Sequence, residues 1–285
     1  MIRLLRRYAF EIVCLCPLVL FLLIFTLVPI IQVFLISLRE PHTAGLTLAH
    51  YRTLLSHREF HHAFFNTLFI AIGSLCLEIF AGLLLAMILA ARIKGTGILK
   101  SLFMLPLAIP TVVAAVMMSY LFSTSGWINR ILLDLGIIHA PVMWLQGGVK
   151  SLFTIMAADS WKVTPLVMLI LLAGLQSIDR DLYKAARIDG AGGWYTFRRV
   201  TLPLLMPCIT AAVIIRGIDA FRIFSLALIL MGENLKVIGT YAYLEYAEYN
   251  NPYLSAASAV ILFLMIMGAV FLYIKAAGKK GVQAA

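Results

Sequence analysis

Six long apolar runs limit what this chain can fold into. Each is about as long as, or longer than, the roughly 20 helical residues that cross a bilayer core, and none alternates as a barrel strand would. Of 285 residues, 62% are hydrophobic and 13% are charged, too little charge for a soluble surface. We expect an all-α, polytopic membrane protein with one transmembrane domain, residues 1–285, and spans at 12–38, 64–91, 101–122, 152–176, 204–231 and 256–275.

The distribution of Lys and Arg predicts the direction of these spans. With the N-terminus inside, fourteen of them fall in inner segments, six in outer segments and three within spans. Inner loops of membrane proteins carry such an excess. We therefore expect both termini, and the connection 177–203, to be cytoplasmic. The net charge of +10 then reflects contact with anionic membrane lipid, and no nucleic-acid partner is expected.

The inner connection 177–203 is polar, rich in glycine and long for a link between two spans. The sequence predicts two short helices around a bend. Asp179 can cap the first helix, and Asp189 and Gly190 can end it, because glycine tolerates the left-handed conformation of a helix stop. Residues 194–200 favour the second helix.

The first helix of this connection has a narrow face. Ala185 and Ala186 lie between Tyr183 and Arg187, a pattern suited to docking in a groove of another protein. The alternative is an interfacial helix whose basic residues touch lipid headgroups. The residues alone favour neither.

Further stretches follow one another in a characteristic order. They are Phe65-Asn-Thr67, Gly82-Leu-Leu-Leu-Ala-Met87, Leu105-Pro106, Gly126-Trp-Ile-Asn129, Trp161-Lys-Val-Thr-Pro165 and Ile218-Asp-Ala-Phe-Arg222. Together with the loop pattern, they resemble the sugar-type permeases of ABC importers, the maltose and glycerol-phosphate transporter group.

The resemblance implies a type I ABC importer permease fold in a bacterial or archaeal cytoplasmic (inner) membrane. It implies alternating access for a sugar or sugar derivative, either a di- or oligosaccharide or a polyol. The implied partners are a second homologous permease, two ATPase subunits and an extracytoplasmic solute-binding protein. This chain would bind no cofactor, with ATP and Mg used by the ATPase. The implied ATPase-coupling residues are Tyr183, Lys184, Ala185, Ala186, Asp189, Gly190, Ala191, Phe197 and Pro203.

Two departures from the family pattern stand out. Lys184 occupies the position where the family usually has Glu, so the expected ion pair with the ATPase would be replaced. After span five, Phe224-Ser225 and Gly232-Glu233 stand where Phe-Asp and Gly-Gly-Pro are usual, which affects the expected outer gate.

Charged residues within spans four and five form a candidate polar site. Such charges are costly in a membrane and normally face the bundle interior or water. Counting depth along the predicted spans favours the pairs Asp159–Arg222 and Lys162–Asp219, with i±3 pairs of Asp219 on its own span as the alternative. The site is either a substrate pathway or an ion-pair network between helices. The candidate pathway residues are Asp159, Trp161, Lys162, Arg216, Asp219, Ala220, Arg222 and Ile223.

Other function classes find less support. The chain lacks the Gly-x-x-x-x-Gly-Lys-Ser/Thr phosphate loop and the common hydrolase motifs, so it is not expected to be an enzyme. No metal site is expected. An ion-coupled secondary transporter or channel, which would act without ATPase subunits, is the alternative to an importer permease.

Overall fold

The fold comes from a computed structural model that describes residues 9–41, 45–91 and 95–281. Within these ranges the secondary structure is helical, apart from one isolated bridge between Arg39 and Leu46. The expected all-α class is therefore confirmed. The termini whose cytoplasmic location the sequence predicts, 1–8 and 282–285, lie outside the described residues, as do Arg92 and Lys94 of the first inner loop.

Five helical segments of the described chain are long and apolar enough to cross a membrane. A sixth is obtained if the bent pair α6–α7 counts as one span. The segments consist of α2 (Ala9–Leu22) with η1 (Leu23–Leu27) and α3 (Val28–Leu38), α5 (Arg58–Ala90), α9 (Gly148–Ser177), α11 (Gly193–Thr196) with η2 (Phe197–Thr201) and α12 (Leu202–Phe221), and α15 (Pro252–Gly281). The shorter helices are α4 (Ala49–Ser56), α6 (Thr96–Ala108), α7 (Thr111–Leu121), α8 (Trp127–Asp134), α10 (Arg180–Ile188), α13 (Ser225–Met231) and α14 (Ile238–Ala247).

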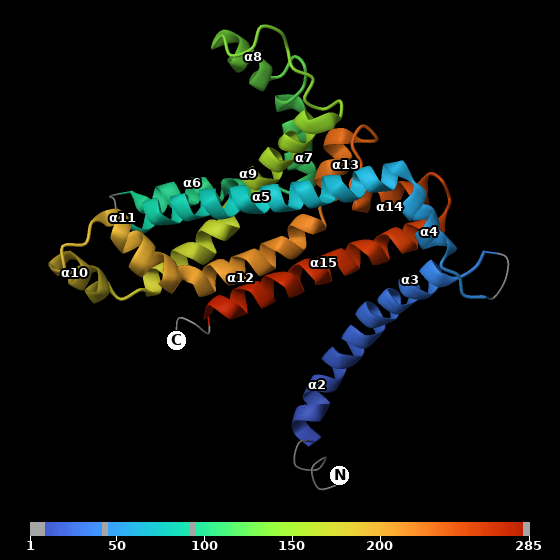
Figure 1. Ribbon diagram of the computed structural model, residues 1–285, viewed down its shortest axis with the longest axis horizontal. Helices are drawn as coiled ribbons and strands as arrows, with labels where there is room; N and C mark the ends of the chain where they lie inside the picture. The colour runs from blue at the N-terminus through green and yellow to red at the C-terminus, as the bar shows by residue number, and fades with distance from the viewer. Residues whose placement is uncertain (1–8, 42–44, 92–94, 282–285) are drawn as a thin grey trace.

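Helices α5, α9, α12 and α15 run side by side and form the body of the molecule (Figure 1). Small residues let them approach closely. A Cβ atom added to Gly82 of α5 would lie 2.8 Å from Val167 of α9, and one added to Gly174 of α9 would lie 2.6 Å from Cys208 of α12. Small residues at contacts are the usual means of packing helices in membranes.

One predicted span is bent within its length, and another is wrong about where it ends. The span 101–122 is broken into α6 and α7, which meet at 95°. Pro110 immediately precedes α7, and the residue before it, Ile109, has the extended backbone that a following proline favours. The span 204–231 also breaks, because α12 ends at Phe221 and a separate helix, α13, begins at Ser225.

Helix α13 is short but apolar because it is buried. Leu226, Ala227 and Leu230 pack in a core cluster with Ile155 of α9 and Ala115 of α7. Its apolar side chains therefore face the protein interior, not lipid. The apolar run after Phe221 does not continue the spanning helix α12.

Two segments leave the body (Figure 1). Helix α3 touches α15 through an edge-to-face contact of Phe34 and Phe263, and α2 then runs away from the bundle. On the opposite side, the α7–α8 arm projects from α9. The buried Asn129 holds this arm together. Its Nδ2 donates to the backbone carbonyls of Ser123, Thr124 and Val142. Its Oδ1 accepts from Val142 N and from Trp144 Nε1.

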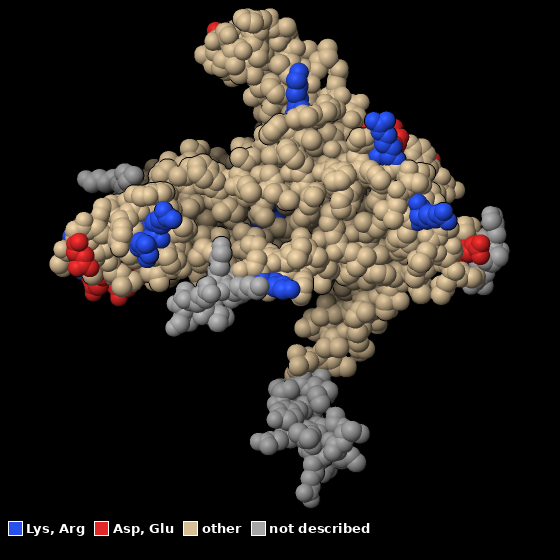
Figure 2. Space-filling view, viewed as in Figure 1, with Lys and Arg blue, Asp and Glu red and all other residues tan. Residues whose placement is uncertain are grey.

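The two ends of the bundle carry different segments. Helices α10 and α11 lie at one end, and α4, α13 and α14 lie toward the other (Figure 1). The second end includes an ion pair between Lys236 and Glu59, with a nitrogen–oxygen distance of 2.8 Å. Partial burial of Lys236 favours its neutral form and lowers its pKa. The Glu59 carboxylate has the larger, opposite effect, so the pKa of Lys236 is raised. Between the ends, the face drawn in Figure 2 is mostly without charged side chains.

Candidate functional site

The connection between α9 and α12 begins with a capped helix. Helix α10 starts after Asp179, whose carboxylate accepts a hydrogen bond of 2.9 Å from the backbone N–H of Asp181. It ends at Ile188, and Gly190 follows with φ of +74°. The predicted cap and stop are therefore confirmed. Both arise from local backbone chemistry, which depends little on the rest of the fold.

The second half of the connection differs from the prediction. Helix α11 continues through the π-helical turn η2 into α12, so that Gly193–Phe221 is one helical segment. Residues 194–200 do not form a separate short helix. Pro203, in the first turn of α12, lacks an N–H donor, and η2 ends two residues before it. A wider π turn accommodates such an irregularity without ending the helix.

A hollow of about 600 Å³ lies between α10 and the start of the α11–α12 segment. Five predicted coupling residues line it together with neighbours from both helices: Ala185, Ala186, Asp189, Gly190 and Ala191. Alanine and glycine leave room here that larger side chains would fill. The hollow is therefore lined by the same small residues whose pattern suggested a docking face.

The remaining predicted coupling residues lie around this hollow. Tyr183 OH is 3.2 Å from Thr201 Oγ1, which joins α10 to η2. Phe197 stacks on Trp194, and Pro203 begins α12. Lys184 is exposed and donates to Asp181 one turn earlier, at 2.7 Å. Its charge is thus paired within α10, in a contact that water screens.

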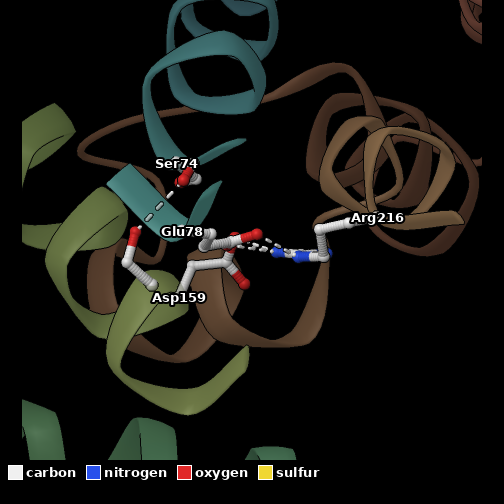
Figure 3. Close-up of polar contacts among 5 residues, drawn as sticks. Ser74, Glu78, Asp159 and Arg216 are labelled. Carbon is white, nitrogen blue, oxygen red and sulfur yellow. Dashed lines mark hydrogen bonds and ion pairs between the residues drawn. The ribbon is translucent and has the colours of Figure 1, made fainter. Parts of the chain in front are cut away.

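A buried cluster joins three helices of the body (Figure 3). Arg216 of α12 donates from Nε to Glu78 Oε2 at 2.6 Å and from Nη2 to Glu78 Oε1 at 2.9 Å, a bidentate pair with α5. The same Nη2 donates to Asp159 Oδ2 of α9. The side chain of Glu78 is 0% exposed, that of Arg216 is 4% and that of Asp159 is 11%. Such a cluster positions the three helices relative to one another.

The structure pairs the intramembrane charges differently from the sequence prediction. Asp159 binds Arg216, not Arg222, and no ion pair within the described ranges involves Lys162 or Asp219. The depth count assumed that the fifth helix continues to residue 231. Because α12 ends at Phe221, Arg222 lies in the break and is exposed, and Arg216 reaches the bundle core instead.

The other candidate pathway residues divide into two sets. Ala220 and Ile223 are buried, so they pack inside this subunit. Trp161, Asp219 and Arg222 are exposed, and Lys162 is half-buried. A cavity between this chain and another could therefore include the second set, whereas the first set supports the cluster around Arg216.

Sequence reasoning left Glu78 without an assigned partner. The available signal was its position: a carboxylate within an apolar run needs a cation, and Arg216 is the matching residue at the same depth in the real helix. Ser74 lies one turn before Glu78 on α5, and its carbonyl accepts from Ser160 Oγ at 3.4 Å. The Ser74 hydroxyl itself is buried and has no hydrogen-bond partner.

Comparison with known proteins identifies the family to which this chain belongs. Residues 78–277 match the family model described as "Binding-protein-dependent transport system inner membrane component". The chain belongs to this family. The matched region includes the buried cluster, the hollow beside α10 and four of the five long apolar helices wholly or in part.

Two curated permeases are similar over nearly their whole length. The trehalose/maltose transport system permease protein MalF of Thermococcus litoralis is 35% identical over 272 residues, which cover 91% of this chain and 90% of the relative. The trehalose transport system permease protein SugA of Mycobacterium tuberculosis is 32% identical over 283 residues, covering 96% and 89%. Both relatives are named as sugar transport permeases.

Solved structures agree with the fold of this inner-membrane component. A bacterial ABC transporter involved in import of the acidic polysaccharide alginate matches with a TM-score of 0.84 and 23% identity, covering 97% of this chain and 98% of that chain. The alginate transporter solved with an alginate pentasaccharide-bound periplasmic protein matches with a TM-score of 0.82 and 24% identity, covering 95% and 94%. The expected type I importer permease fold is confirmed.

Family membership also decides between the transporter classes. The chain is an ABC importer permease component of the binding-protein-dependent kind, so the secondary transporter or channel alternative is not retained. The resemblance that the ordered stretches suggested is confirmed. The described helices support a multi-pass protein of the inner membrane.

Proposed function

We propose that this chain is one permease subunit of an ATP-driven, binding-protein-dependent importer of a sugar or sugar derivative. The observation that carries the proposal is the match to trehalose and maltose permeases along almost the full chain. A di- or oligosaccharide is the favoured substrate class, with a polyol as the smaller alternative. Transport would proceed by alternating access, in which the site opens to one side of the membrane at a time.

The second step of the proposal concerns the partners. The exposed apolar surfaces of α2 and of the α7–α8 arm support contact with a second, homologous permease and with lipid, because such area is costly in water. An extracytoplasmic solute-binding protein would deliver substrate at the end that carries α4 and α14. A relative of this fold has been solved with such a periplasmic protein.

The hollow beside α10 is the proposed contact with one of two ATPase subunits. ATP and Mg would be used there, in the partner, and this chain would bind no cofactor and catalyse no reaction. The coupling residues Ala185 and Ala186 give α10 its narrow face, and Tyr183 ties α10 to η2. A rigid-body shift of α10 would thereby reach α12 and Arg216.

This arrangement requires α10 on the cytoplasmic side, where ATP is available, and so both termini inside. The excess of Lys and Arg in the predicted inner segments supports that direction. The exposed side chains of Trp161, Asp219 and Arg222, with the half-buried Lys162, would then line the path between the two permeases. Trp161 offers an aromatic face for a sugar ring, and the charged groups offer hydrogen bonds to hydroxyls.

The test is reconstitution of the complete transporter in liposomes. We expect uptake of trehalose or maltose only when ATP, the ATPase subunits and the binding protein are all present. A matched liposome with ADP in place of ATP should show none. Sugar uptake by this chain without ATPase subunits would contradict the proposal, and ATP-dependent uptake of a non-sugar solute alone would contradict its substrate class.

A further inference from the structure

The buried cluster contains more negative than positive charge. Glu78 and Asp159 share the single guanidinium of Arg216, and all three groups are almost completely removed from water. The nearest further charges do not correct the excess, because the half-buried Lys162 of α9 and the exposed Asp219 of α12 cancel one another. An uncompensated charge in a low-dielectric core is costly, and a carboxyl group normally avoids this by taking up a proton.

The hydrogen bonds show which carboxyl group is free to do so. Both oxygens of Glu78 accept from Arg216, so a proton on either would displace a strong charge-assisted bond. Asp159 uses only Oδ2 for Arg216, and its Oδ1 has no hydrogen bond in the described structure. A proton on Oδ1 therefore removes the excess charge without loss of an existing contact.

A partner for that proton lies on α5. Ser74 is 0% exposed, and its hydroxyl is the one buried side-chain polar atom of the described residues without a hydrogen-bond partner. It precedes Glu78 by one helical turn on α5, so it lies beside the same cluster (Figure 3). A protonated Oδ1 can donate to this hydroxyl, which otherwise remains unsatisfied at a cost.

The cluster also has a route for exchange. The Asp159 side chain is 11% exposed, whereas that of Glu78 is 0% exposed. Asp159 is thus the more accessible of the two carboxyl groups, on the helix that also carries the exposed Trp161.

From these observations we propose that Asp159 is a proton-binding site, carrying a proton on Oδ1 while α5, α9 and α12 are packed as in this structure. The proton comes from solvent, is held between Asp159 and Ser74, and leaves Glu78 and Arg216 as a neutral ion pair. The permease would then bind a proton in this conformation and release it when α12 moves away from α5 and α9. This inference concerns the packed cluster and does not depend on the substrate.

Infrared spectroscopy of the full chain, assembled with its partner subunits in lipid nanodiscs at neutral pH, tests the site directly. The difference between wild type and Asp159→Asn should contain a carboxylic-acid C=O band that shifts in heavy water and with isotopically labelled aspartate. Asp219→Asn, which removes an exposed carboxylate, should leave that band in place. Glu78→Gln should abolish it, because Asp159 then becomes the sole anionic partner of Arg216.

Three results would overturn the proposal. One is the absence of an acid band in the difference between wild type and Asp159→Asn. This comparison does not require a Glu78 variant that folds. Another is a band that persists in Glu78→Gln, since the proton would then be independent of the charge excess. The third is stabilisation of the complex by sodium, but not by choline at equal ionic strength, that disappears in Asp159→Asn. That outcome would assign the compensating charge to a metal cation.

Discussion

Arg216 Nε lies 2.6 Å from Glu78 Oε2, and this contact joins α12 to α5 across 138 residues of sequence. Both side chains are buried, so neither can exchange its partner for water. Removal of one member of such a pair leaves a buried charge, which costs more than the pair itself contributes. The contact therefore makes the packing of α12 dependent on α5.

We expect Arg216→Gln to destabilise the assembled permease by about 3–5 kcal/mol, the range for breaking a buried ion pair. The measurement is the thermal unfolding midpoint of the purified complex, or its yield in size exclusion if it unfolds during purification. The control is Arg222→Gln, which removes an exposed Arg next to the end of α12. Adding Glu78→Gln to Arg216→Gln should restore much of the lost stability. Equal midpoints for Arg216→Gln and Arg222→Gln would contradict the prediction.

The contrast between Asp179 and Arg216 shows what the sequence can predict. Asp179 and Gly190 act on backbone within one turn, so their roles as cap and stop are readable from the residues alone. The partner of Arg216 depends on where α12 ends. Hydropathy placed that end at residue 231, because Leu226 and Leu230 are as apolar in a buried short helix as in a spanning one. After the break at 222–224, α13 packs against α7 and α9. These contacts are between residues distant in sequence, so no local sequence pattern predicts them.

A second prediction concerns the contact of α5 with α9. Gly82→Val should destabilise the protein by about 1–3 kcal/mol, the usual cost of overpacking. A Cβ atom at Gly82 would lie 2.8 Å from Val167 and 3.1 Å from the backbone N of Met168, and the backbone cannot move aside as a side chain can. Gly268→Val in α15 is the matched control, because an added Cβ there meets no atom within 4 Å. Thermal unfolding of both variants measures the difference, and equal losses would contradict it.

The α7–α8 arm depends on Asn129. In Asn129→Asp, the carboxylate can still accept from Val142 N and Trp144 Nε1, but it cannot donate to the carbonyls of Ser123, Thr124 and Val142. We expect a loss of about 1–3 kcal/mol from the buried groups left unsatisfied. Limited proteolysis of the arm and the fluorescence of Trp144 should report local opening while the bundle stays folded. Unaltered protection of the arm would contradict the role of Asn129.

The pair of Lys184 and Asp181 allows a test of charge at α10. Exchanging the two residues, Asp181→Lys with Lys184→Asp, keeps an ion pair on the helix but moves its charges by one turn. The pair itself is exposed, so α10 should remain folded, with a change of less than about 1 kcal/mol. If the ATPase carries an acidic group opposite Lys184, its affinity should fall about fivefold or more at low salt, and the difference should shrink as salt is added. Unchanged affinity for the exchanged variant would assign the docking to shape alone.

The last prediction uses two glycines with nearly the same backbone. Gly190 has φ of +74° and its N–H donates to Arg187 O at 3.1 Å, while Gly136 has φ of +68° and its N–H donates to Leu133 O at 2.9 Å. An added Cβ meets no atom within 4 Å at either position, so substitution acts only through the backbone. Proline fixes φ near −65° and removes the donor, so it is incompatible with both sites.

Both variants should lose similar local stability, but only Gly190→Pro reshapes the hollow beside α10. We therefore expect Gly190→Pro to insert into membranes with its spans intact and to lose ATPase binding and ATP-dependent uptake. Gly136→Pro, in the projecting arm, should retain ATPase binding. Co-purification of the ATPase subunits with each variant is the measurement. Equal retention, or equal loss, in the two variants would show that the bend at Gly190 has no special part in docking, because the proline strain common to both would then explain the result.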